Sequence, residues 1–166
     1  MKKRYVALIF CAIGLLLGSV TSEAKKKPSV TAESAIVMDV QSGAILYEKN
    51  IDKREYPASI TKVMTALVAI ENSSLSETVT YSRNAVTNLE SGASNIEIQP
   101  GEKLSMEDSL YAILLMSANE ACNGVAEHVA GSIDNFVAMM NQKAKELGCT
   151  GTHFANANGL WMSNHY

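Results

Sequence analysis

The sequence of 166 residues predicts an α+β protein in which strands come first and a helical lobe follows. Two aliphatic runs, 35–38 and 44–47, bracket a turn segment that contains Gly43. After residue 58, apolar residues recur every three or four positions in several segments, which is the period of a helix. The composition, 47% hydrophobic and 19% charged with three cysteines, is typical of a globular chain rather than a disordered or disulfide-stapled one.

The segment 1–24 has the anatomy of a secretory signal peptide. Basic residues at 2–4 precede an apolar run of about 15 residues, which is shorter than the roughly 20 that a membrane-spanning helix needs. Ser22 and Ala24 then place small residues before a cleavage point. We therefore expect export to the periplasm or cell envelope, cleavage after Ala24 and a polar linker over 25–33.

The net charge of −3 disfavours nucleic acid and anionic membrane surfaces as partners.

Two cysteines, Cys122 and Cys149, remain after the signal peptide. Because they belong to separate segments, the sequence favours two buried free thiols and leaves a Cys122–Cys149 disulfide as the alternative.

The first half of the folded region opens with a hairpin, since Gly43 offers the positive φ that tight turns use. A helix is expected over 59–71, directly after Pro57, and its apolar residues lie nearly all round, which predicts a buried helix. A short strand over 78–81, a brief helix capped by Ser82 and a loop region follow.

Three helices are expected in the second half, each ended by a change of pattern or a glycine. The last of them has one apolar stripe that should face the core. The three helices cover 105–116, 119–130 and 133–147, and the stripe consists of Phe136, Met140, Ala144 and Leu147.

Ser59 and Lys62 are the first candidate catalytic residues. Three residues apart on one helix, their side chains share a face within hydrogen-bonding reach. A lysine among apolar neighbours loses solvation, which favours its neutral form and lets it act as a base toward a serine nucleophile. Since Ser-x-x-Lys also occurs by chance, a capping serine and a lysine that reaches solvent remain the alternative.

Ser117 and Asn119 are the second pair of candidates, because they lie between two helical segments. Ser117 could relay a proton, and Asn119 could donate an amide hydrogen bond to a substrate carbonyl. The alternative for either residue is a cap for the helix that follows.

Together these features resemble the penicilloyl serine transferases, above all the low-molecular-mass D-alanyl-D-alanine carboxypeptidases, whose signatures are Ser-x-x-Lys, Ser-x-Asn and Lys-Thr-Gly. The stretch 56–65 is similar to the nucleophile helix of that family, and 37–43 to its opening strands. The resemblance implies that 34–166 is the N-terminal part of a β-lactamase/DD-peptidase-like catalytic domain. Further similar stretches are 99–102, 117–121, 152–156 and 158–160.

The resemblance implies a reaction without metal or cofactor. Ser59 would attack the penultimate D-Ala carbonyl of a peptidoglycan stem peptide, release D-Ala and be freed by hydrolysis, and β-lactams would acylate the same serine. Lys62 and Ser117 would move protons, and Asn119 would bind substrate. Because no Lys-Thr-Gly or Lys-Ser-Gly occurs, we expect a C-terminally truncated member that stops before the later strands. The membrane-anchoring region that many carboxypeptidases of this type carry would lie beyond the end of this sequence, so the sequence leaves membrane association open.

Three other hypotheses compete with this one. A zinc peptidase is disfavoured because the three histidines show no ligand spacing such as His-Glu-x-x-His. An exported penicillin- or peptidoglycan-binding remnant without turnover would follow from loss of the third motif. A DD-endopeptidase or transpeptidase on the same scaffold is not separated from a carboxypeptidase by these motifs.

Overall fold

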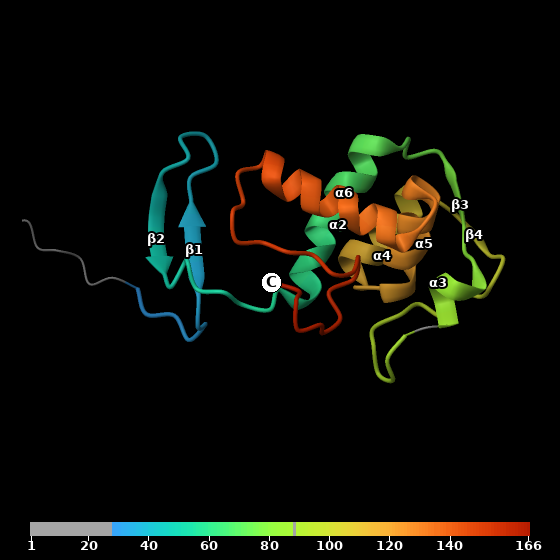
Figure 1. Ribbon diagram of the computed structural model, residues 1–166, viewed down its shortest axis with the longest axis horizontal. Coiled ribbons are helices and arrows are strands. Elements are labelled where there is room, and N and C mark those ends of the chain that lie inside the picture. The colour runs from blue at the N-terminus through green and yellow to red at the C-terminus, as the bar shows by residue number, and fades with distance from the viewer. Residues whose placement is uncertain (1–27, 88) are drawn as a thin grey trace, which may run out of the picture. The chain divides into compact units, whose positions relative to one another are not determined.

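The computed structural model describes residues 28–87 and 89–166 (Figure 1). They fall into two compact units, one that ends at Ile51 and one that covers Asp52–Tyr166. The expected signal peptide and the first residues of the expected linker lie outside the described residues, and residues 28–33 are exposed and irregular. The expected domain over 34–166 takes in residues of both units, and its bounds stay a prediction. Within the described ranges, no helix is both long and apolar enough to cross a membrane.

The first unit contains the expected hairpin of β1 (Ala35–Met38) and β2 (Ile45–Lys49), which pair antiparallel from Ala35 opposite Lys49 to Met38 opposite Ile45 (Figure 1). Asp39 organises the turn, because one of its carboxylate oxygens accepts from the backbone N–H of Ser42 at 2.8 Å and from its hydroxyl at 2.5 Å. These hydrogen bonds lower the pKa of Asp39. Gly43 has a φ of +71°, as the turn requires.

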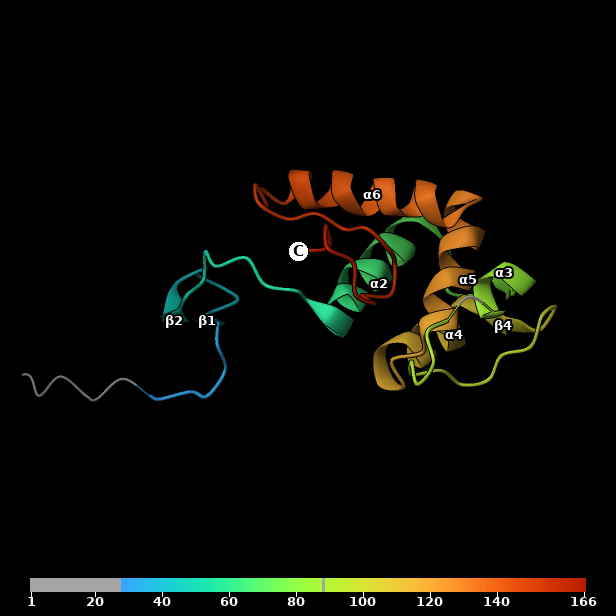
Figure 2. The same cartoon turned by 60° about the horizontal axis from the view of Figure 1, so that its bottom comes forward.

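The second unit is mainly helical, and its core is built around one helix, α5. This helix packs against α2, α3, α4 and α6, and Figure 2 shows it descending from the start of α6. Its residues Ala121, Cys122, Val125 and Ala126 are fully buried. The elements of this unit are η1 (Ala58–Ile60), α2 (Thr61–Asn72), β3 (Thr78–Thr80), α3 (Arg83–Thr87), β4 (Lys103–Ser105), α4 (Met106–Leu115), α5 (Asn119–Ala130) and α6 (Ile133–Glu146).

Gly124 in the middle of α5 is explained by the ring of Tyr81. A β-carbon at this position would lie 2.3 Å from the ring, so only glycine lets the tyrosine pack against the helix. Tyr81 is fully buried, and its hydroxyl donates to Ser109 Oγ at 2.8 Å. Burial raises the pKa of Tyr81 to about 12.

The three helices predicted for the second half are confirmed as α4, α5 and α6. Local signals in the sequence mark several of their ends. Ser105 caps α4 by accepting from the N–H of Asp108 at 3.0 Å, and Ser132 caps α6 in the same way. Ser82 caps α3 as expected, with 3.0 Å to the N–H of Ala85. The strand β4 was not predicted, since three residues are too few to show an alternating pattern. It pairs antiparallel with β3, and among the described residues the strands form two separate two-stranded sheets.

The prediction of one buried helix over 59–71 is wrong in two respects. Ser59 lies in the 3-10 turn η1, and α2 begins only at Thr61. One face of this segment is exposed, with Ile60 at 75% and Val63 at 64%. The buried face of α2 is instead mostly small or polar, because it packs against the small residues of α5 and carries part of the site described below. It consists of Thr61, Lys62, Thr65, Ala66, Val68 and Ala69.

Candidate active site

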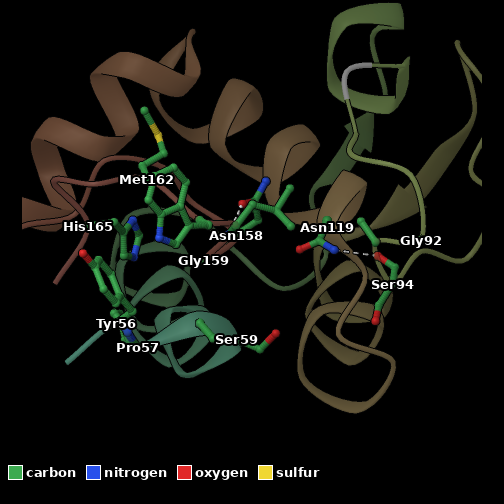
Figure 3. A pocket seen from close by; sticks show the side chains of 14 residues that line it. Tyr56, Pro57, Ser59, Gly92, Ser94, Asn119, Asn158, Gly159, Met162 and His165 are labelled. Atoms are coloured by element: carbon green, nitrogen blue, oxygen red, sulfur yellow. Dashed lines mark hydrogen bonds between the residues drawn. The ribbon is translucent and has the colours of Figure 1, made fainter.

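Ser59 opens onto a cavity of about 330 Å³ in the second unit. The cavity is lined by residues of η1, of the loop before β4, of the start of α5 and of the loop after α6. Figure 3 shows Ser59 at the bottom of the view, Asn119 and Ser94 at the right, Asn158 and Gly159 above Ser59, and His165 at the left. The other lining residues are Tyr56, Pro57, Ala58, Gly92, Ala93, Leu160, Trp161 and Met162.

Ser59 is presented by a tight turn rather than by a regular helix. The N–H of Ile60 donates to the carbonyl of Pro57 at 3.1 Å, and Ala58 has a φ of +47°, which L-residues rarely adopt. The exposed Ser59 hydroxyl has two polar neighbours: Lys62 Nζ at 3.3 Å and Ser117 Oγ at 3.0 Å. A serine that contacts both an amine and a second hydroxyl has the surroundings of an activated nucleophile.

Lys62 is only 3% exposed, and its amine has three oxygen partners. Nζ donates to Asn119 Oδ1 at 2.9 Å, to the carbonyl of Asn158 at 2.7 Å and to Ser59 Oγ at 3.3 Å. Burial lowers the pKa of Lys62, although the carboxylate of Glu120 opposes this effect. The alternative of a lysine that reaches solvent is therefore wrong.

The three partners of Lys62 differ in what they can accept or give. A neutral amine has two N–H groups and one lone pair, and the oxygens of Asn119 and Asn158 can only accept. When Lys62 is neutral, its two N–H groups point at these acceptors, and its lone pair is directed at the hydroxyl of Ser59. An amine held in this way is able to accept a proton from a neighbouring hydroxyl.

Ser117 and Asn119 lie where the sequence places them, between α4 and α5 and at the first position of α5. Ser117 has a φ of +56° and donates to Ser59 Oγ. The N-cap residue of α5 is Ala118, with no side-chain capping bond, so the capping alternative for both residues is wrong. The backbone N–H and the side-chain Nδ2 of Asn119 both donate to the carbonyl of Ser94, at 3.0 and 2.8 Å (Figure 3). The amide has a second N–H, which these bonds leave for a substrate carbonyl.

The loop 156–159 is part of the site and was not predicted as such. Asn156 Oδ1 accepts from the backbone N–H groups of Asn158 and Gly159, at 3.2 and 2.7 Å, and so shapes the turn that directs the Asn158 carbonyl at Lys62. Asn158 Nδ2 also donates to Asn123 Oδ1 on α5 at 3.2 Å. A backbone carbonyl carries no residue-type signal, and only the asparagine-rich turn in the sequence could have indicated it.

Gly159 fixes this loop against the turn that carries Ser59. It has a φ of +84°, and a β-carbon there would lie 2.0 Å from the carbonyl oxygen of Ala58. Only glycine permits this approach.

No group of three or more His, Cys, Asp or Glu side chains that could hold a metal ion occurs in the part of the chain that the structure describes. His128 lies on the surface of α5, and its Nε2 contacts Glu77 Oε2 at 2.8 Å. The polar side chains that line the cavity include hydroxyls, amides and the imidazole of His165, and the buried amine of Lys62 contacts the hydroxyl of Ser59. A hydroxyl beside an amine suits nucleophilic attack on a carbonyl group.

The chain belongs to a known peptidase family: the family model described as D-alanyl-D-alanine carboxypeptidase, peptidase family S11, matches residues 21–166. The D-alanyl-D-alanine carboxypeptidase DacF of Bacillus subtilis is 35% identical, over 99% of this chain and 44% of its own length. The predicted resemblance is thereby confirmed.

Solved structures support the fold. Penicillin-binding protein 5 of Haemophilus influenzae has a TM-score of 0.79 at 32% identity, covering 85% of this chain and 42% of its own. A mutant of the Streptomyces K15 DD-transpeptidase has a TM-score of 0.78 at 28% identity, covering 84% of this chain and 57% of its own. The predicted β-lactamase/DD-peptidase-like α+β fold is confirmed. The chain spans less than half the length of the curated relative.

Proposed function

We propose that the protein is a serine-type D-alanyl-D-alanine carboxypeptidase that removes the terminal D-Ala from peptidoglycan stem peptides. Family membership supports this reaction, and so does the bonding of Lys62. The buried amine donates to two oxygens that cannot donate in return and lies 3.3 Å from Ser59 Oγ, so a neutral Lys62 has its lone pair left for the Ser59 hydroxyl. This is the observation that carries the proposal.

In the first step, Ser59 Oγ attacks the carbonyl carbon of the penultimate D-Ala while Lys62 takes the hydroxyl proton. The tetrahedral intermediate then collapses with cleavage of the C–N bond. Ser117, whose oxygen lies 3.0 Å from Ser59 Oγ, passes a proton to the departing D-Ala amine and is reprotonated from Lys62. The product of this half-reaction is an ester between Ser59 and the shortened peptide.

In the second step, water hydrolyses the ester and restores the Ser59 hydroxyl. The free N–H of Asn119 donates to the substrate carbonyl in both steps. A β-lactam acylates Ser59 through the same attack, except that its amide nitrogen stays tethered to the acyl group by the opened ring.

The test is acylation by a fluorescent penicillin, measured by intact mass, together with D-Ala release from a pentapeptide. Ser59→Ala should lose both signals. Ser163→Ala, which changes an exposed serine that does not line the cavity, is the matched control and should keep both. Lys62→Met should lower the acylation rate by roughly 10²- to 10⁴-fold.

The outcomes separate the proposed activity from its rivals. Labelling without D-Ala release would identify a penicillin-binding remnant, and loss of neither signal in Ser59→Ala would refute the assignment of the nucleophile. The similarity to a DD-transpeptidase favours transfer as a second candidate reaction. Adding a D-amino acid or glycine acceptor decides this, because transfer gives a product of different mass from hydrolysis.

We also propose export to the cell envelope, supported by the signal-peptide pattern of residues 1–24. Intact mass of the penicillin-labelled protein from the envelope fraction tests it. A protein that begins at Lys25 is expected, and one that still begins at Met1 would contradict cleavage. Extraction of the labelled protein with detergent, compared with extraction by salt, tests whether it is associated with the membrane.

A further inference from the structure

His165 is a buried histidine in the wall of the active-site cavity with no role in the steps above. It is 2% exposed. One ring nitrogen, Nε2, lies 2.8 Å from Thr61 Oγ1, and the other, Nδ1, accepts from the backbone N–H of Ala155 at 3.2 Å. The ring of Phe154 packs edge-on against it, with the ring centroids 5.7 Å apart.

The N–H of Ala155 determines the protonation state of this ring. A backbone N–H can only donate, so Nδ1 must be unprotonated and the single proton of the neutral ring lies on Nε2. Nε2 therefore donates to Thr61 Oγ1. A second proton, on Nδ1, would face the N–H of Ala155 donor to donor and break that bond.

Thr61 joins this bond to the catalytic residues. It is 2% exposed and stands between Ser59 and Lys62, at the junction where η1 ends and α2 begins. The loop that carries His165 also supplies the carbonyl of Asn158 to Lys62. The His165–Thr61 bond thus ties that loop to the segment that holds both the nucleophile and its base.

We propose that neutral His165 is a positioning residue that holds the loop 153–166 against the segment 59–62, and that protonation of its ring releases this hold and inactivates the site. The predicted loss of activity rests on the proposed function. The contact between the loop 153–166 and the segment 59–62 does not depend on that function. The release is an equilibrium between two protonation states and needs no other reactant.

The surroundings of His165 disfavour its charged form. Burial lowers the pKa of His165 below its usual 6.5, and the nearby imidazole of His153 lowers it further. The guanidinium of Arg54 lies over the ring of Tyr166, 3.7 Å from its centroid. The titratable and charged side chains on the neighbouring segments 54–62 and 153–166 are Arg54, Glu55, Tyr56, Lys62, His153 and Tyr166.

The hold is tested by NMR of the uniformly ¹⁵N-labelled protein, without any substrate. At pH 7 the ring of His165 should carry its proton on Nε2. On acidification, the amide signals of Ala155 and Asn158 should shift with the same midpoint as the His165 ring, and that shared midpoint should vanish in His165→Gln. A proton on Nδ1 at pH 7, or amides that do not follow the ring, would overturn the proposal.

The catalytic consequence is tested by the pH profile of penicillin acylation. In the wild type both the Lys62 amine and the His165 ring must lose a proton before the site is active. The logarithm of the acylation rate plotted against pH should therefore rise with a slope approaching 2 at low pH. His165→Gln removes one of them, because an amide can still donate to Thr61 without titrating, and its slope should be 1. His128→Gln, on the surface of α5, is the matched control and should keep a slope of 2.

Conservative variants separate positioning from mere folding. Thr61→Val removes the acceptor and should lower the acylation rate, whereas Thr61→Ser should restore it. A slope of 2 in His165→Gln would overturn the catalytic part of the proposal. Acylation absent from the wild type would refute the proposed function instead, and the NMR result would still decide whether His165 holds the loop.

Discussion

Asn119 accepts a hydrogen bond from Lys62 through its side-chain oxygen, at 2.9 Å from Nζ. The acceptor is an uncharged amide, so it orients the amine without stabilising the ammonium form as a carboxylate would. Its nitrogen is held by the carbonyl of Ser94, which fixes which end of the amide faces the lysine. The amine of Lys62 is therefore held in a fixed orientation, and its pKa is lowered by burial.

Asn119→Asp should weaken the base while keeping nearly the same shape. A carboxylate beside Lys62 favours the ammonium and raises the pKa of the lysine. Since the proposed reaction needs the neutral amine, the acid limb of the acylation profile should move to higher pH by about 1 unit or more, with a rate loss of about 10-fold or more at pH 7. Asn119→Ala is the control: it should lower the rate without this displacement, and an unmoved limb in Asn119→Asp would contradict the role of Lys62.

Glu120→Gln should displace the same profile in the opposite direction. Glu120 is 1% exposed, and one of its oxygens accepts from the N–H of Ile96 at 2.6 Å, a bond that glutamine can keep. Burial lowers the pKa of Lys62 and the Glu120 carboxylate counteracts this, so removing the charge lowers the pKa further. The acid limb should therefore move to lower pH in a stopped-flow acylation measurement. A shift to higher pH would show that the carboxylate does not act on Lys62.

Gly159→Ala should destabilise the protein by more than backbone strain alone. The new β-carbon would lie 2.0 Å from the carbonyl oxygen of Ala58, the residue before Ser59. Gly131→Ala is the matched control, because its φ is +75° but nothing lies within 4 Å of the added carbon. Urea unfolding should show a loss of about 1–2 kcal/mol for the control. A larger loss is expected for Gly159→Ala, together with slower acylation, and equal losses would mean that the close approach is unimportant.

Local signals made much of the fold predictable. Serines 105 and 132 mark helix starts, and Gly131 ends α5, because caps and glycines act within a few residues. Ser59 and Lys62 could be paired from their spacing for the same reason, even though the serine lies in a 3-10 turn and not in the helix.

Features that depend on distant segments could not be predicted. The carbonyl of Asn158 reaches Lys62 across 96 positions of the chain, and the His165–Thr61 bond spans 104. The hydrophobic pattern also fails to predict burial where the end of a helix determines which side chains are covered. Leu147, expected in the core stripe of α6, is 59% exposed because it is the residue at which the helix ends, whereas Phe136, Met140 and Ala144 are buried as predicted.

The two cysteines differ in burial, and this difference predicts a difference in thiol reactivity. Both are free, as expected, and Cys122 is fully buried on α5, but Cys149 is exposed, so the prediction of two buried thiols is wrong for Cys149. Burial raises the pKa of Cys122 to about 12, which leaves almost no reactive thiolate at pH 8. Iodoacetamide should therefore modify Cys149 in the native protein and reach Cys122 only after unfolding in urea. Peptide mapping by mass spectrometry distinguishes the two sites, and Cys149→Ser is the control that should remove the native signal. Modification of Cys122 without urea would show that α5 opens in the native state.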